Sequence, residues 1–83
     1  MIGEHDRVVL TEPLEAEGLE AGDIGAIVHV YPQHEAYEVE FVTLTGKTAT
    51  IVTVPAAKIR PVSGSEIPHA RAMAVGPTNR GSE

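Results

Sequence analysis

Gly18, Gly22 and Gly25 stand just before an apolar run, where a phosphate-binding loop would place its glycines. Their spacing, G-x3-G-x2-G, matches neither the dinucleotide-binding pattern nor the P-loop pattern. A phosphate loop also needs the N-terminus of a helix behind it, and here a stretch typical of a strand follows. We therefore expect structural glycines, with Gly22 at a turn of positive φ and Gly25 at a curved strand or a bulge.

Histidine and glutamate side chains are the other candidates for chemistry. His29, His34 and Glu35 are metal-ligating residue types, but a proline turn separates the two histidines and nothing in the spacing makes them converge. Glu38 and Glu40 would lie about 7 Å apart on one strand face, as paired carboxylates do, although a solvated face explains them as well. We predict no metal site and no cofactor.

The residues needed for nucleophilic catalysis are missing or badly placed. The chain has no cysteine, which excludes thiolate catalysis, disulfides and cysteine-ligated metals. Its serines, Ser63, Ser65 and Ser82, all lie in the C-terminal part. A serine nucleophile needs a base held beside it, and no such pairing is evident there. The sequence therefore predicts a protein that is not an enzyme.

The charge balance limits the class of partner. The 83 residues carry 12 acidic and 6 Lys or Arg side chains, a net charge of −6. Residues 1–62 hold 10 of the acidic and 4 of the basic side chains. Such a surface repels phosphate backbones, so nucleic acid is disfavoured. No apolar run reaches the roughly 20 residues of a membrane span, and the charged N-terminus is unlike a signal peptide. We expect a soluble, cytoplasmic protein that does not bind membranes.

The acidic loop, residues 12–23, is the most distinctive surface feature. Acid clusters are often only solvated, but this one also fits electrostatic docking to a basic protein, beside an exposed patch of Ile27 and two tyrosines. The predicted partner-binding residues are Glu15, Glu17, Glu20, Asp23, Tyr31 and Tyr37.

Short strands position these residues. Strands are predicted at residues 6–10, 23–31, 37–44 and 48–54, with a helical turn and a short edge strand over residues 55–62. In the second strand, strict alternation puts Ile24, Ala26, Val28 and Val30 on one face and Ile27, His29 and Tyr31 on the other. In the third, Tyr37, Val39 and Phe41 face away from Glu38 and Glu40. No long helix is predicted, so the fold is an all-β, antiparallel barrel or sandwich.

Beyond residue 62 the chain is rich in Ser, Gly and Pro. We predict a flexible C-terminal tail or extended arm over residues 63–83, with one helical turn possible near residues 69–75. Ile67, Met73 and Val75 are the apolar residues that a docked arm would use.

The segments DRVVL, GLEAGDIGAIVHVYP, YEVEFV and VPAAKIRPV resemble a family of small bacterial proteins known only as a domain of unknown function. The same order is more distantly similar to the SH3-like domain of the nitrile hydratase beta subunit and to the activator proteins of that enzyme. This resemblance implies a five-stranded SH3-like barrel over residues 5–62 that binds another protein. Hydratase activity does not follow, because that enzyme's metal lies in a cysteine-rich motif of its other subunit.

The function we predict is a non-catalytic module that binds another protein, as an accessory subunit, an assembly factor or an antitoxin-like neutraliser. The alternative is a KOW-like nucleic-acid-binding barrel. It would need a basic face, for which Lys47, Lys58 and Arg60 are the candidates.

Overall fold

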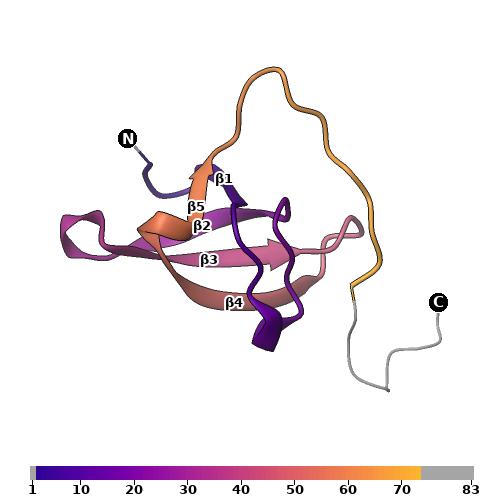
Figure 1. Cartoon of the computed structure of the whole chain (residues 1–83), viewed down its shortest axis with the longest axis horizontal. Coiled ribbons are helices and arrows are strands. Elements are labelled where there is room, and N and C mark those ends of the chain that lie inside the picture. The colour runs from indigo at the N-terminus through magenta and orange to yellow at the C-terminus, as the bar shows by residue number, and fades with distance from the viewer. Residues whose placement is uncertain (1, 74–83) are drawn as a thin grey trace.

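Five antiparallel strands form one sheet in the computed structural model, which describes residues 2–73. The strands are β1 (Arg7–Leu10), β2 (Ile24–Val30), β3 (Ala36–Val42), β4 (Thr48–Pro55) and β5 (Ile59–Pro61). Their order in the sheet is β4-β3-β2-β1-β5 (Figure 1). The predicted all-β, five-stranded antiparallel fold is confirmed. Within residues 2–73, no ladder joins β4 to β5, so the SH3-like barrel is open along that side.

Three short 3-10 turns connect the strands: η1 (Glu15–Glu17), η2 (Pro32–His34) and η3 (Ala56–Lys58). The last one is the helical turn that the sequence predicts before the edge strand. None of the helical turns in residues 2–73 has the length and apolar character needed to cross a membrane.

The core lies on one side of β3, as the period-two pattern predicts. Tyr37, Val39 and Phe41 are at most 4% exposed, whereas Glu38 and Glu40 on the opposite face are only partly buried. The core cluster also includes residues from every other strand and one from the acidic loop: Val8, Leu10, Leu19, Ile27, Val54 and Ile59. Valine, isoleucine and leucine side chains thus make up most of the core, with Tyr37 and Phe41 beside them, as the composition predicts.

The predicted faces of β2 are wrong because of a bulge. Its pairing with β3 shifts register between Ile27 and His29, which inserts Val28 as an extra residue. Ile27 is fully buried before the bulge and Val30 packs against the core after it. Val28 is left 41% exposed. A strict two-residue period cannot follow a strand across such an insertion.

The two glycines singled out at the start of β2 have separate structural roles. Gly22 has a φ of 97°, the positive value predicted for the turn that enters β2. Gly25 is buried, and a Cβ there would lie 2.5 Å from Val39 Cγ1 and 3.0 Å from the Glu40 carbonyl oxygen. Gly25 therefore lets β3 approach closely, and the bulge lies further along the strand.

Residues 62–73 form an extended C-terminal arm without helix or strand. The arm leaves β5, arches away from the sheet and returns beside the turn between β3 and β4 (Figure 1). Met73 packs against the core cluster, while Ile67 is 86% exposed. The predicted helical turn is absent from residues 69–73. The rest of the predicted tail, including Val75, lies outside the described residues.

Candidate partner-binding surface

The acidic loop is a built structure that is anchored to the core at its base. Leu14 and Leu19 pair across it as an isolated antiparallel bridge, with N···O distances of 2.9 and 3.1 Å. Leu19 is 3% exposed in the core cluster and Leu14 packs against that cluster. The turn between them, η1, carries Glu15 and Glu17, and both side chains are exposed. The leucines therefore hold the charged turn out into solvent.

Asp23 sits in a second, tighter turn whose backbone fixes its carboxylate. Its backbone N–H donates to the Glu20 carbonyl at 3.1 Å, and its Oδ2 accepts from the Glu20 N–H at 2.8 Å. The backbone of this turn also bonds twice to Leu10, through the Gly22 N–H and the Asp23 carbonyl. This carboxylate is thus oriented before anything binds to it.

The arm places an arginine on this carboxylate. Arg71 Nε donates to Asp23 Oδ1 at 2.9 Å and one terminal nitrogen donates to Oδ2 at 2.5 Å, a bidentate pairing. The same terminal nitrogen lies 3.1 Å from the Gly18 carbonyl oxygen, and Glu20 Oε1 lies 3.6 Å from Nε. The side chains of Arg71 and Asp23 are 23% and 18% exposed. The acidic loop therefore holds a guanidinium group from 48 residues along the chain.

The electrostatics of this contact favour the ionised pair. Burial raises the pKa of Asp23, but the hydrogen bonds from Arg71 and from the Glu20 N–H outweigh burial, and the pKa lies below its ordinary value. Asp23 is therefore a carboxylate at neutral pH and holds Arg71 by charge as well as by geometry.

An open groove of about 400 Å³ lies beside this contact. Leu19, the turn before β2 and Ile24 at the start of β2 form one wall, and the end of β3 with the turn after it, residues 41–45, forms another. Residues 68–73 of the arm lie along the third side, so the arm covers one side of the groove and the 400 Å³ is the space that it leaves open. Exposed apolar side chains mark the groove, with Ile24, Val42 and Leu44 exposed by 38%, 53% and 86%.

The predicted apolar patch beside the acidic loop is wrong. Ile27 and Tyr37 are 0% and 4% exposed and belong to the core, because both face inward across the sheet. Tyr31 is partly exposed, but it follows β2 while Asp23 precedes that strand. A seven-residue strand separates them by on the order of 20 Å. The acidic residues of the loop and the tyrosines therefore do not form one surface.

Tyr31 instead belongs to a polar cluster on the outer face of the sheet. Its hydroxyl donates to Glu38 Oε2 at 2.7 Å, and the Thr53 hydroxyl donates to the same oxygen at 2.9 Å. These hydrogen bonds, Tyr31 first, hold the pKa of Glu38 below its ordinary value. The His29 ring meets the Tyr31 ring edge to face at 4.8 Å. The Glu38 carboxylate is thus occupied by hydroxyl donors.

The histidines considered as metal ligands, His29 and His34, do not converge on one site. The His34 ring packs against Tyr37 at 6.1 Å, away from the His29 and Tyr31 pair. The part of the chain that the structure describes contains no group of three potential ligands able to hold a metal ion. Glu40 accepts a hydrogen bond from the Thr48 hydroxyl.

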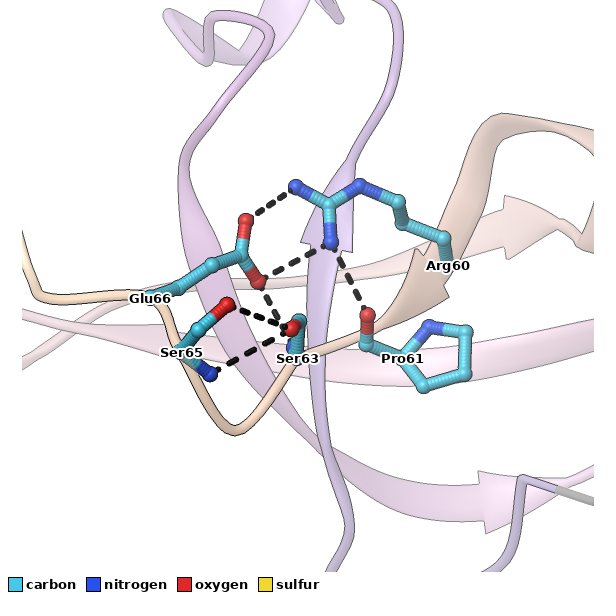
Figure 2. A network of polar contacts seen from close by, with 5 residues as sticks. All are labelled: Arg60, Pro61, Ser63, Ser65 and Glu66. Atoms are coloured by element: carbon cyan, nitrogen blue, oxygen red, sulfur yellow. Dashed lines mark hydrogen bonds and ion pairs between the residues drawn. The ribbon is translucent and has the colours of Figure 1, made fainter.

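A second arginine pair shapes the base of the arm (Figure 2). Arg60 on β5 meets Glu66 with N···O distances of 2.6 and 3.1 Å, and Glu66 Oε1 also accepts from the Ser63 N–H at 2.7 Å. The hydrogen bonds from Arg60 and then Ser63 lower the pKa of Glu66 to about 2. Ser65 completes the network through the Ser63 hydroxyl, 3.2 Å away.

Sequence reasoning missed Arg71 as a site residue. The signal was faint: one arginine between small residues, in a C-terminal part with two acidic and two basic side chains, opposite a loop rich in acids. Charge complementarity across 48 residues has no sequence period, so only the three-dimensional structure pairs Arg71 with Asp23.

A family model described as "Domain of unknown function (DUF4926)" matches residues 4–61. The chain therefore belongs to this family, and the match covers the whole sheet but not the arm. Searches of the curated proteins and of the solved structures found no match.

Proposed function

We propose that the chain, as a member of this family, is a non-catalytic module that binds another protein through its acidic loop. It would act as an accessory subunit, an assembly factor or an antitoxin-like partner in the cytoplasm. One observation carries the proposal: the acidic loop already binds a guanidinium, through Asp23 and the Gly18 carbonyl. A loop that holds one arginine in this geometry is suited to arginines on a basic protein surface.

Charge and resemblance support the same role. Five of the chain's acidic residues lie within residues 12–23, and the net charge of −6 would steer the loop toward a basic surface. The resemblance to the SH3-like domain of the nitrile hydratase beta subunit and to its activators, and to small bacterial proteins, favours an accessory role. The absence of cysteine and the position of the serines favour a non-catalytic one.

The test is partner capture by the full chain from its native cell, with Glu15 and Glu17 reversed to Lys. Both are exposed, and Glu20, whose carboxylate lies 3.6 Å from Arg71, is left intact along with Asp23. The matched control reverses Glu4 and Glu35, which are exposed and change the net charge equally. Capture should fall at least tenfold with the Glu15 and Glu17 variant only. A loss of about 1.4 kcal/mol in binding free energy lowers the affinity by that factor. Equal capture by both variants would refute docking through the acidic loop.

The nucleic-acid alternative is tested on the same chain. It predicts RNA or DNA binding that weakens steeply with salt. Of the three basic side chains named for it, Arg60 is already paired with the Glu66 carboxylate. Binding of a labelled RNA at low salt that is lost with Lys47→Ala and Lys58→Ala would favour this alternative.

A further inference from the structure

We infer that the groove beside Asp23 is a recognition site for an arginine-bearing extended segment of the partner, and that the arm occupies this site as an intramolecular competitor. The inference rests on the proposed function and names the ligand chemistry and the regulation of that surface. Its basis is that the arm contacts the barrel in the manner of a bound peptide.

The first element of the site is its arginine pocket. Asp23 is held by its own turn, and the Gly18 carbonyl is presented by the left-handed residue that ends η1. Two carboxylate oxygens and one carbonyl oxygen therefore converge on one guanidinium, at 2.5 to 3.1 Å. A lysine ammonium is a point charge and cannot satisfy this planar arrangement. The pocket therefore selects arginine.

The second element is the space on either side of the arginine. Arg71 is flanked by Ala70 and Ala72, whose small side chains let an extended backbone lie along the groove. Two residues beyond the arginine, Met73 packs against the core cluster. The segment bound in the groove thus reads small–Arg–small–apolar, and a partner segment of this type would make the same contacts.

The third element is how lightly the arm is held between its ends. Its first turn is closed by Glu66 with Arg60, and the next contacts are those of Arg71. Between them, residues 67–70 are exposed and make no hydrogen bond within the described chain. Displacing the described part of the arm therefore breaks no hydrogen bond to the barrel other than those of Arg71, while the turn at Glu66 stays closed.

The arm acts as a competitor because it is tethered. A segment on a short linker has an effective concentration in the millimolar range, so a weakly attractive arm still occupies the arginine pocket at one side of the groove. A partner segment then binds with an apparent affinity reduced by the fraction of chains whose groove is open. A partner surface with several arginines would thus displace the arm, whereas a single weak contact would not.

Charge decides between a foreign partner and a second copy as the displacing chain. A second copy brings the same −6 net charge, and its arm offers nothing that the tethered arm lacks. A basic partner is attracted by the acidic loop and by Asp23, which loses its counter-charge when the arm leaves. We therefore assign the groove to a partner segment of opposite charge.

The test uses a fluorescent peptide with the chain's own residues 67–73, IPHARAM, as the probe, and the full chain as receptor. Anisotropy titrations compare the wild type with Arg71→Ala, in which the competitor lacks its arginine. We expect the Arg71→Ala chain to bind the peptide at least about tenfold more tightly than the wild type. Peptides with Lys or Ala in place of the arginine should bind the same variant at least tenfold more weakly.

Three outcomes would overturn the inference: equal affinity of the two chains, no binding to the Arg71→Ala chain, or equal binding of the three peptides. The peptide series leaves the receptor unchanged, so it remains decisive without any substitution in the arginine pocket. A wild-type dimer in light scattering that disappears with Arg71→Ala would also overturn it, since the occupant would then be a second copy.

Partner capture separates this inference from the proposed function. Capture that depends on Glu15 and Glu17 but does not increase with Arg71→Ala would leave the function standing and refute the competing arm. Peptide binding as predicted, with no loop-dependent partner, would support the groove and refute the proposed function.

Discussion

Two turns of this protein share one hydrogen-bond pattern, but the arginines that they hold lie at very different separations along the chain. In each, a carboxylate accepts the N–H of the residue three positions earlier and then holds an arginine. Asp23 does so with the Glu20 N–H at 2.8 Å and Glu66 does so with the Ser63 N–H at 2.7 Å. The arginine of the first turn is 48 residues away, and that of the second is six residues away.

Their surroundings differ as well. Asp23 and Arg71 are 18% and 23% exposed, whereas Glu66 and Arg60 are 36% and 44% exposed. Solvent and salt weaken an exposed pair, so the Glu66 turn mainly shapes the start of the arm. The Asp23 turn joins the arm to the acidic loop. The burial of an ion pair and the sequence separation of its partners, more than its geometry, thus decide what it does.

Removing the support of the Asp23 turn should have the largest effect. Leu19→Ala deletes a side chain that is 3% exposed and fixes the acidic loop in the core, so we expect a loss of about 2–5 kcal/mol in the free energy of unfolding. Urea denaturation measures it. Leu44→Ala, at an 86% exposed position of the same groove, should stay within about 0.5 kcal/mol. Equal losses for the two variants would mean that Leu19 does not anchor the loop.

The glycines of the two turns offer a matched comparison. Gly22 has a φ of 97°, so Gly22→Ala should destabilise the fold by about 1–2 kcal/mol through backbone strain alone, since a Cβ meets no atom there. Gly64 also has open space and no positive φ, and Gly64→Ala should change stability by less than about 0.5 kcal/mol. Thermal unfolding of both variants decides it, and an equal response would contradict the assigned strain.

Acid titration should separate the two carboxylates. The pKa of Glu66 is lowered to about 2 from an ordinary value of 4.5, so its contribution to stability is complete above 4.5 and is lost as the pH falls toward 2. In Arg60→Ala, the Glu66 pKa should rise toward 4.5 while that of Asp23 stays low. In Arg71→Ala, only the Asp23 pKa should rise. Carboxyl-carbon NMR titrations measure both, and a shift of the wrong carboxylate would break the comparison.

Raising the salt concentration should have the smallest effect of the four changes, and it should change the pKa values of Glu66 and Asp23 by different amounts. Raising the ionic strength to about 1 M shortens the screening length to about 3 Å, which weakens exposed pairs most. The Glu66 pKa should therefore rise more than the Asp23 pKa between low and high salt. The same NMR titrations at two salt concentrations test this, and a larger change at Asp23 would contradict the difference in burial.

The strands and turns of this fold were predictable because local rules govern them. Alternation in residues 37–41 identified the buried face of β3, and glycine chemistry identified the positive φ at Gly22. The bulge at Val28 was not predictable, because a register shift depends on how β2 and β3 meet. Ile27 precedes the insertion; it was placed on the surface because strict alternation put it on one face with His29 and Tyr31, and the insertion separates it from them.

The candidate site was predictable only in part. The acidic residues were found from charge alone, but Tyr37 was misjudged because an aromatic residue has the same sequence signature in a core and at an interface. The contact between Arg71 and Asp23 was missed because nothing local connects the two residues.

The most direct test of the central claim is a comparison of amide NMR spectra for Arg71→Ala and Arg60→Ala in the full chain. If the long-range pair holds the arm on the acidic loop, Arg71→Ala should shift the amides of Gly18, Glu20, Asp23 and Met73. Arg60→Ala should shift only residues around 60–66. Unchanged acidic-loop amides in Arg71→Ala would contradict the account, because the arm would then not rest on that loop.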